Sequence, residues 1–225
     1  MNKLLTIAID GPVGSGKGTL SLALSKKLGI LYLYTGGMYR ALTLACERKG
    51  IDLNNEEDVL RVLQDCDLHL KVSSGDTVIY LGNEDVTEAI VRPEVSNKTP
   101  FIALHPQVRD EMVRRQKEII DGHASVIEGR DIATAVAPDA EIKIFLTASL
   151  EARALRRFKQ FKEKGIQKTY EEVLSDTRER DQRDENRDIS PLNKHAGTIE
   201  IDTTTDKVDQ TVEKVMEILK NQKFI

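Results

Sequence analysis

The sequence predicts an α/β fold in which helices cover both faces of a parallel β-sheet. A short apolar run, Leu4 to Ile9, ends at Asp10-Gly11-Pro12 and is typical of a buried parallel strand. Leucines then recur every four residues at Leu20, Leu24 and Leu28, which indicates one face of a helix. Strands and helices go on alternating along the chain, as they do in parallel sheets with helical crossovers.

Later segments continue this alternation with one interruption. Short strands are expected at residues 125–127, 142–146 and 198–201, and helices at residues 106–120, 150–164, 169–187 and 208–219. Between residues 67 and 91, apolar residues alternate on either side of Ser73-Ser74-Gly75-Asp76. That pattern predicts a small β-hairpin inserted into the α/β fold.

Length and composition limit the class of protein. The 225 residues suffice for one compact domain with an appendage, and 40% hydrophobic with 31% charged residues is an ordinary globular balance. The net charge of −4 does not suggest a basic surface for nucleic acid, and no segment has the length of a membrane span. The two cysteines, Cys46 and Cys66, are expected to be reduced thiols. We expect a cytoplasmic protein, and a monomer because no apolar helix face is left unassigned.

The strongest functional signal is a glycine-rich segment between the first strand and the first helix. It has the spacing G-x4-G-K, and such a loop surrounds phosphate with backbone N–H donors at the positive end of a helix dipole. Lys17 can then reach the β- and γ-phosphates of a nucleotide. The candidate ATP phosphate-binding residues are Gly11, Gly14, Ser15, Gly16, Lys17, Gly18 and Thr19.

The residue after the lysine departs from the usual pattern. A serine or threonine normally follows the lysine and contacts Mg²⁺, but here Gly18 stands there and Thr19 comes one residue later. Mg²⁺ is expected to enter with ATP, and Thr19 is the one candidate among the protein's direct ligands. The loop alone does not separate kinases from GTPases or motor ATPases.

Arginines occur in settings that suit the neutralisation of phosphates. Arg40 ends a segment from Tyr34 that is expected to be a turn leading into a helix, and Arg130 follows the strand at residues 125–127. Ligands of open α/β sheets bind at such carboxyl ends of strands. In residues 177–187, eight of eleven are charged, and Arg180, Asp184 and Arg187 share one helix face. Taken alone, this run and residues 153–159 are more typical of solvated, salt-bridged helices.

In their order and spacing, these motifs resemble those of bacterial-type cytidylate kinases from about residue 4 to residue 219. The matching motifs are Ile9-Asp10-Gly11-Pro12, Gly14-x-Gly16-Lys17-Gly18-Thr19, Thr35-Gly36-x-Met38-Tyr39-Arg40, Val108-Arg109, Arg114-Arg115-Gln116, Glu128-Gly129-Arg130-Asp131-Ile132, Pro138-Asp139-Ala140, Arg180-Asp181, Arg183-Asp184, Asn186-Arg187 and Ile201-Asp202-Thr203-Thr204.

The resemblance implies a single P-loop kinase domain over residues 1–225 that transfers the terminal phosphoryl group of ATP to CMP or dCMP. It implies a core of residues 1–34, 101–152 and 190–225, an acceptor-binding region with the hairpin at 35–100, and a helical lid at 153–189. ATP and CMP or dCMP are then the expected partners, with Mg²⁺ as cofactor and no nucleic acid or membrane.

The resemblance also implies roles for individual residues. Arg40, Arg130 and Arg187 would grip the acceptor phosphate, and Arg180 and Asp184 would hold the sugar. Arg109 and Asp131 would read the cytosine edge, and Arg153 and Arg157 would close over the ATP phosphates. The implied catalytic residues are Lys17, Arg130, Arg187, Arg157 and Arg153, and the implied acceptor-binding residues are Thr35, Tyr39, Arg40, Arg109, Arg130, Asp131, Arg180, Asp184 and Arg187.

Four positions depart from the family pattern. The family usually has Asp at Tyr34, a small residue such as Ala at Gly37, and Gly at Ala133. A serine that helps to bind cytosine in relatives aligns with Pro100, so that contact is absent here or moved to Thr99.

Two other functions stay open at this point. One is a kinase for another monophosphate, such as UMP or AMP. The pair Arg109 and Asp131 favours cytosine, because a carboxylate accepts from the cytosine amino group and would face an oxygen of uracil. The other is a nucleotide-dependent switch with no acceptor substrate. Arginines at four separate sites favour a protein that holds an acceptor phosphate as well.

Overall fold

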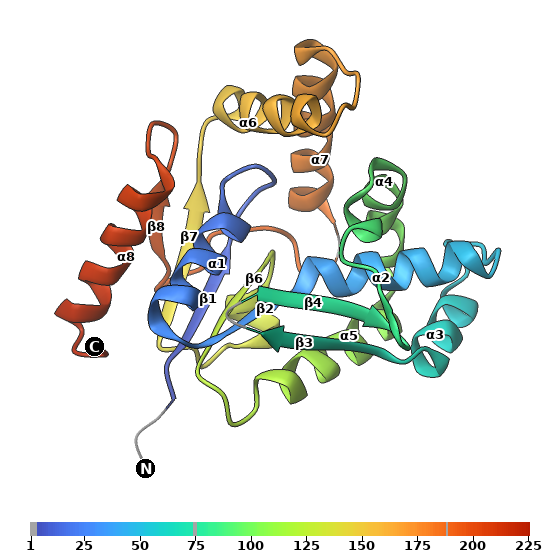
Figure 1. The fold of residues 1–225 in the computed structure, drawn as a ribbon, viewed down its shortest axis with the longest axis horizontal. Helices are drawn as coiled ribbons and strands as arrows, with labels where there is room; N and C mark the ends of the chain where they lie inside the picture. The colour runs from blue at the N-terminus through green and yellow to red at the C-terminus, as the bar shows by residue number, and fades with distance from the viewer. Residues whose placement is uncertain (1–3, 74–75, 188) are drawn as a thin grey trace.

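The central element of the fold is a five-stranded sheet in the order β2-β6-β1-β7-β8 (Figure 1). The computed structural model describes residues 4–73, 76–187 and 189–225. Every neighbouring pair of strands in this sheet is parallel, which confirms the predicted α/β class. The strands are β1 (Thr6–Asp10), β2 (Leu31–Tyr34), β6 (Ser125–Gly129), β7 (Ile142–Thr147) and β8 (Ile199–Asp202).

Alternate residues of β1 enter two separate hydrophobic cores. Ala8 packs in one core, whereas Ile7 and Ile9 pack in the other, because successive side chains of a strand point to opposite faces. The first core also takes residues from α2 (Thr35–Arg48), α3 (Glu56–Asp65) and α5 (Pro106–Ile120), and the second from α1 (Lys17–Leu28) and α8 (Val208–Asn221). The sheet is therefore covered on both faces, as predicted.

A separate antiparallel sheet confirms the predicted hairpin. It consists of β3 (Leu68–Ser73), β4 (Asp76–Leu81) and the short β5 (Glu84–Asp85). The predicted turn residues Ser74 and Gly75 lie outside the described residues. The Thr77 hydroxyl donates to the carbonyl of Tyr32 at 2.5 Å, and Ile79 packs in the core with α2. The hairpin is thus fixed against the edge strand β2 and the helix that follows it.

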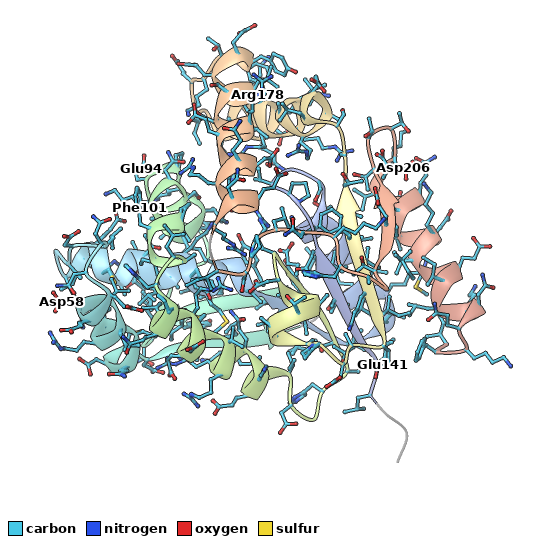
Figure 2. The ribbon with its side chains drawn as sticks, turned by 180° about the vertical axis from the view of Figure 1, so that it is seen from behind. Asp58, Glu94, Phe101, Glu141, Arg178 and Asp206 are labelled. Atoms are coloured by element: carbon cyan, nitrogen blue, oxygen red, sulfur yellow. The ribbon has the colours of Figure 1, made fainter. Side chains whose placement is uncertain are left out.

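Three helices stand beyond the carboxyl ends of the central strands (Figure 1). They are α4 (Pro93–Ile102), α6 (Leu150–Glu163) and α7 (Tyr170–Asn186). Figure 2 shows Arg178 on α7, and Glu94 and Phe101 on α4, on the same side of the sheet. This arrangement places α4 and the pair α6–α7 around the sheet edge at which parallel α/β folds bind ligands.

One local expectation was wrong, and one helix ends a residue earlier than expected. The segment from Tyr34 to Arg40 contains no turn, because β2 runs to Tyr34 and α2 begins directly at Thr35. The helix expected to reach residue 187 ends at Asn186, and Arg187 is extended, with ψ 142°. Among the described residues, no helix is long and apolar enough to span a membrane.

Candidate active site

The phosphate loop is held in place by close backbone contacts at its glycines. Gly11 has φ +149°, and a Cβ added there would lie 2.1 Å from the carbonyl oxygen of Leu146. Gly14 has φ +76°, and Gly16, with φ +94°, directly precedes α1. Glycine adopts these positive φ values without steric cost, and the missing Cβ lets the loop touch β7. The predicted strand–loop–helix unit is therefore present, with the amides of α1 free at its start.

Lys17 lies across this loop. Its Nζ donates to the carbonyl oxygens of Gly11 at 2.6 Å and Pro12 at 2.8 Å, and the side chain is buried. Burial, together with the positive charge of Arg130, holds the pKa of Lys17 well below its usual value. An anion at the loop would counter both effects. The Lys17 ammonium is thus placed where phosphate would favour its charged form.

Arg153 lies behind the loop instead of over the cavity. Its guanidinium donates to the carbonyl oxygens of Ala148 at 2.9 Å and Val13 at 3.3 Å, and it pairs with Asp181 at 2.6 Å. Arg153 is buried and does not line the cavity, unlike Arg157, which does. The sequence motif contained Asp181, but gave no sign that this carboxylate joins α7 to the back of the phosphate loop.

A second arginine of α6 connects the phosphate loop with the segment after β8 through hydrogen bonds. Arg156 donates to the carbonyl oxygen of Gly14 at 3.3 Å and to the Thr203 hydroxyl at 3.1 Å. The Thr203 hydroxyl in turn donates to the carbonyl oxygen of Ser15 at 3.0 Å. The sequence assigned no role to Arg156 or Thr203, because residues about fifty or more apart meet only in the folded chain.

Glu128 faces the position that a longer side chain would occupy at Gly18. A Cβ added to Gly18 would lie 3.2 Å from the Oε1 of Glu128, and the Tyr32 hydroxyl donates to that oxygen at 2.6 Å. Glu128 is buried, yet it lines the cavity together with Thr19. Burial and the Glu128 charge raise the pKa of Tyr32, so that its hydroxyl stays protonated and donating.

Arginines from several elements lie close to one another along the same cavity. Arg130, after β6, pairs with Asp184 of α7 at 2.7 Å between Nε and Oδ2. Burial, followed by the positive charges of Arg130 and Arg40, lowers the pKa of Arg180 to about 9. Burial raises the pKa of Asp184, but the positive charges of Arg130 and Arg180 lower it. The net effect is a pKa below the usual value of an aspartate. This arginine cluster comprises Arg40, Arg130, Arg157, Arg180 and Arg187, all of which line the cavity.

The arginine cluster contains more positive charge than its carboxylates balance. Within the described chain, the buried Nε atoms of Arg157 and Arg180 and one terminal nitrogen of Arg187 have no hydrogen-bond partner. Burial lowers the pKa of both Arg157 and Arg187. Buried donors without acceptors are costly, so the cluster is built to receive an anion that accepts several hydrogen bonds.

Arg109 of α5 and Asp131 form a buried ion pair at another side of the cavity. The pair joins two residues 22 positions apart, one on a helix and one after β6. Tyr39 of α2 lies near it, and burial raises the pKa of its phenol to about 12. A planar group that enters here would find a guanidinium donor and a carboxylate acceptor side by side.

The helix α4 contributes Thr99 and Pro100 to the same side. The Thr99 hydroxyl donates to the carbonyl oxygen of Val95 at 2.8 Å and is contacted by the Thr43 hydroxyl at 3.2 Å. Both Thr99 and Pro100 line the cavity. Pro100 lies inside the helix, where it has no N–H to donate. Thr99 is therefore a hydroxyl residue of α4 that lines the same cavity as the ion pair.

One cavity of about 1330 Å³ lies among these groups. The sequence-predicted residues that line it are Gly14, Gly16, Lys17, Gly18, Thr19, Thr35, Tyr39, Arg40, Arg109, Arg130, Asp131, Arg157, Arg180, Asp184 and Arg187. Gly11, Ser15 and Arg153 do not line it; they belong to the loop backbone and its support. Tyr32, Tyr34 and Glu128 line it without a role from the sequence.

Comparison with known proteins identifies the family of this chain. Residues 7–221 match the family described as cytidylate kinase. The chain is 42% identical to a cytidylate kinase of Anoxybacillus flavithermus over 99% of both chains, and 43% identical to one of Bacillus licheniformis over 97% of both.

Solved structures support the fold alone. The shikimate kinase of Acinetobacter baumannii aligns with a TM-score of 0.51 at 15% identity, covering 99% of this chain and 97% of that one. A gluconokinase of Sinorhizobium meliloti aligns with a TM-score of 0.50 at 12% identity, covering 98% and 96%. The resemblance found in the motifs is confirmed over almost the whole length. This chain belongs to the cytidylate kinase family.

Proposed function

We propose that this protein transfers the terminal phosphoryl group of ATP to CMP or dCMP, giving ADP and CDP or dCDP. The observation that carries the proposal is that the phosphate loop, the arginine cluster and the Arg109–Asp131 pair line one cavity. The loop suits a nucleotide triphosphate, the cluster suits a second phosphate, and the pair suits an amino-pyrimidine edge. Family membership supports the same reaction.

The reaction needs positioning more than acid–base chemistry. A phosphate oxygen of the acceptor attacks the γ-phosphorus in line, while the bond from that phosphorus to the β–γ bridging oxygen breaks and ADP leaves. The attacking oxygen is already anionic near neutral pH, so no strong base is required. Lys17 and the arginine cluster offset the repulsion between the two nucleotides and the charge that develops between them.

The arginines would bind different parts of the two nucleotides, according to their positions in the cavity. Arg40, Arg130 and Arg187 would hold the acceptor phosphate, and Arg180 with Asp184 the sugar. Arg157, on α6, would cover the ATP phosphates as the region 153–189 closes and excludes water. Arg153 would contribute indirectly, since it supports the loop through Val13 and Asp181.

Two oxygen donors fit a magnesium ion beside the loop. Glu128 places a carboxylate against Gly18, and Thr19 lines the same cavity. Hard oxygen ligands of this kind, together with phosphate oxygens, are what Mg²⁺ prefers. Among the described residues, no three His, Cys, Asp or Glu side chains gather as a metal site, so the phosphates would complete the coordination. When bound, the ion would neutralise charge on the β- and γ-phosphates.

An acceptor panel tests the proposal. ADP release with ATP and Mg²⁺ would be followed in the presence of CMP, dCMP, UMP or AMP. We expect CMP and dCMP to stimulate release strongly, with UMP far weaker. ADP release that is independent of added CMP would indicate a nucleotide switch, and preference for UMP or AMP would indicate another monophosphate kinase. Either result would overturn the proposal.

Base selectivity has its own test at Asp131. Asp131→Asn replaces an acceptor by an amide that also donates, so we expect the ratio of kcat/KM for CMP over UMP to fall about tenfold or more. Asp110→Asn is the matched control, because Asp110 is exposed on α5 beside Arg109. An unchanged ratio in Asp131→Asn would remove this carboxylate from base recognition.

A further inference from the structure

Tyr34 lies at the junction between β2 and α2, but its side chain does not cap the helix. It is the N-cap residue of α2, with φ −91° and ψ 85°, and its side chain makes no capping hydrogen bond. N-cap positions favour Ser, Thr, Asp or Asn, whose side chains accept from the free amides of the first turn. A tyrosine here gives up that stabilisation, so its side chain must be explained by other contacts.

The Tyr34 side chain contacts Arg40, one of the arginines of the cluster. The phenol oxygen accepts a hydrogen bond from a terminal nitrogen of Arg40. The guanidinium carbon also lies 5.7 Å from the centre of the Tyr34 ring. Among the described residues, no carboxylate pairs with Arg40. Arg130 differs, since Asp184 pairs with it. The phenol therefore directs the Arg40 guanidinium while leaving its positive charge uncompensated.

Gly37 is the residue that accommodates the Tyr34 ring. It is buried in the first turns of α2, and its φ is not in the left-handed region, so the backbone itself does not require glycine. A Cβ at Gly37 would lie 2.5 Å from Cδ1 of Tyr34 and 2.4 Å from Cδ1 of Ile79. Glycine weakens a helix interior relative to alanine, so the Tyr34 ring and Ile79 are the physical reason for its presence here.

The rest of the Tyr34 environment keeps the ring in one place. Tyr32 stacks on it from the same strand, with ring centroids 6.5 Å apart and planes 18° from parallel. Tyr34 itself lines the cavity, as do Tyr32 and Arg40. The ring is thus held by a neighbour on β2 and by the first turns of α2, and its hydroxyl reaches a cation at the cavity wall.

We propose that Tyr34 is a positioning residue for Arg40, and that Gly37 is required because of the Tyr34 ring. Tyr34 orients an uncompensated guanidinium toward the phosphate of the acceptor nucleotide. This inference rests on the proposed function, in which Arg40 binds that phosphate. The arrangement makes residues 34, 37 and 40 one unit whose members cannot be exchanged independently.

The hydroxyl is tested by Tyr34→Phe, which keeps the ring and removes the hydrogen bond. We expect the KM for CMP to rise about fivefold, the worth of one hydrogen bond, with the KM for ATP unchanged. Tyr80→Phe is the matched control, because Tyr80 stacks on His69 and does not line the cavity. An unchanged KM for CMP, or an equal rise for both nucleotides, overturns the positioning role.

The steric half is tested by Gly37→Ala in two backgrounds. With Tyr34 present, we expect the melting temperature to fall by about 3 °C or more, because the new methyl group displaces the ring. In Tyr34→Asn, which removes the ring without adding charge, the same substitution should lower the melting temperature clearly less, because only the contact with Ile79 remains. The contact with Ile79 is present in both backgrounds, so it does not affect the difference between them. An equal change in both backgrounds overturns the claim.

The two tests separate this inference from the proposed function. If the wild-type protein phosphorylates no CMP, the proposed function fails, and the role of Arg40 toward the acceptor fails with it. The melting-temperature comparison needs no substrate and still decides the Tyr34–Gly37 relation. If the wild-type protein phosphorylates CMP but Tyr34→Phe leaves its KM unchanged, only the inference fails.

Discussion

The phosphate loop and the arginine cluster face the same cavity but are built from different parts of the chain. The loop is a continuous segment whose backbone is fixed by glycines at positive φ and by contact with β7. The cluster collects side chains from α2, α6, α7 and the end of β6. The loop is therefore fixed by contacts within the chain itself, whereas the cluster holds excess positive charge that a ligand would balance.

This difference has a consequence for substitution. A change in the loop acts on backbone geometry or on the single buried ammonium of Lys17. A change in the cluster alters a balance of charges, in which Asp184 already offsets part of the repulsion between Arg130 and Arg180. Loop variants should thus separate folding from activity, and cluster variants should respond to added anions.

The largest effect is expected at Lys17. Lys17→Ala should lower kcat/KM by about a thousandfold, near 4 kcal/mol, because it removes a cation placed beside the phosphates. The melting temperature should not fall, because the substitution also removes a buried charge that is costly to desolvate. Lys27→Ala, on an exposed position of the same helix, is the control. A near-normal rate in Lys17→Ala would show that the loop does not bind the reacting phosphates.

The next effect concerns the loop backbone. Gly11→Ala should lower the free energy of unfolding by about 3 kcal/mol, because its Cβ would overlap the Leu146 carbonyl at 2.1 Å. Gly16→Ala meets no atom within 4 Å, so only its φ of +94° is strained, at about 1–2 kcal/mol. Urea unfolding of both variants measures the difference. Equal losses would show that the contact with β7 does not fix the loop.

A smaller effect is expected in the cluster. Asp184→Asn removes the counter-charge of Arg130 and Arg180 and should cost about 2 kcal/mol of stability without ligand. Sulfate should then raise the melting temperature of the variant more than that of the wild type. Glu185→Gln makes the same charge change on an exposed neighbour. If sulfate stabilises Asp184→Asn no more than the wild type, the cluster is not short of negative charge.

The smallest effect is expected at Glu111, a carboxylate whose charge is balanced by neighbouring arginines and which lies outside the cavity. On α5, hydrogen bonds from Arg114 and Arg115 lower the pKa of Glu111 to about 2. Because this pKa is depressed in the folded state, its stabilisation is present above the unfolded value near 4.5 and is lost as pH falls toward 2.

Glu111→Gln measures that contribution. After screening by solvent, we expect a loss of about 1 kcal/mol at pH 6 and almost none at pH 2. Glu57→Gln, on an exposed position of α3, should show little change at either pH. Chemical denaturation at the two pH values gives the comparison. An equal loss at both values would show that the effect of Glu111 is not electrostatic.

The sequence predicted the elements whose patterns are local. The predicted strands at 125–127, 142–146 and 198–201 correspond to β6, β7 and β8, and the predicted helices to α5, α6, α7 and α8. Apolar periodicity specifies such elements because it depends only on neighbours along the chain. The strand β2 was not predicted, because a run of four residues directly after a helix is too short for a periodic pattern. The helix α4 was not predicted either, because Pro93 and Pro100 are not typical of a helix.

By itself, the sequence determined the α/β fold, the glycine-rich loop after the first strand and the family, and it predicted the arginines of the site. Only the tertiary structure decided which of these groups face the cavity. It placed Arg153 behind the loop with Asp181, Glu128 against Gly18, and the Tyr34 ring over Gly37. The physical reason is that a glycine-rich loop is encoded by adjacent residues, whereas ion pairs and steric fits depend on distances between segments that only folding brings together.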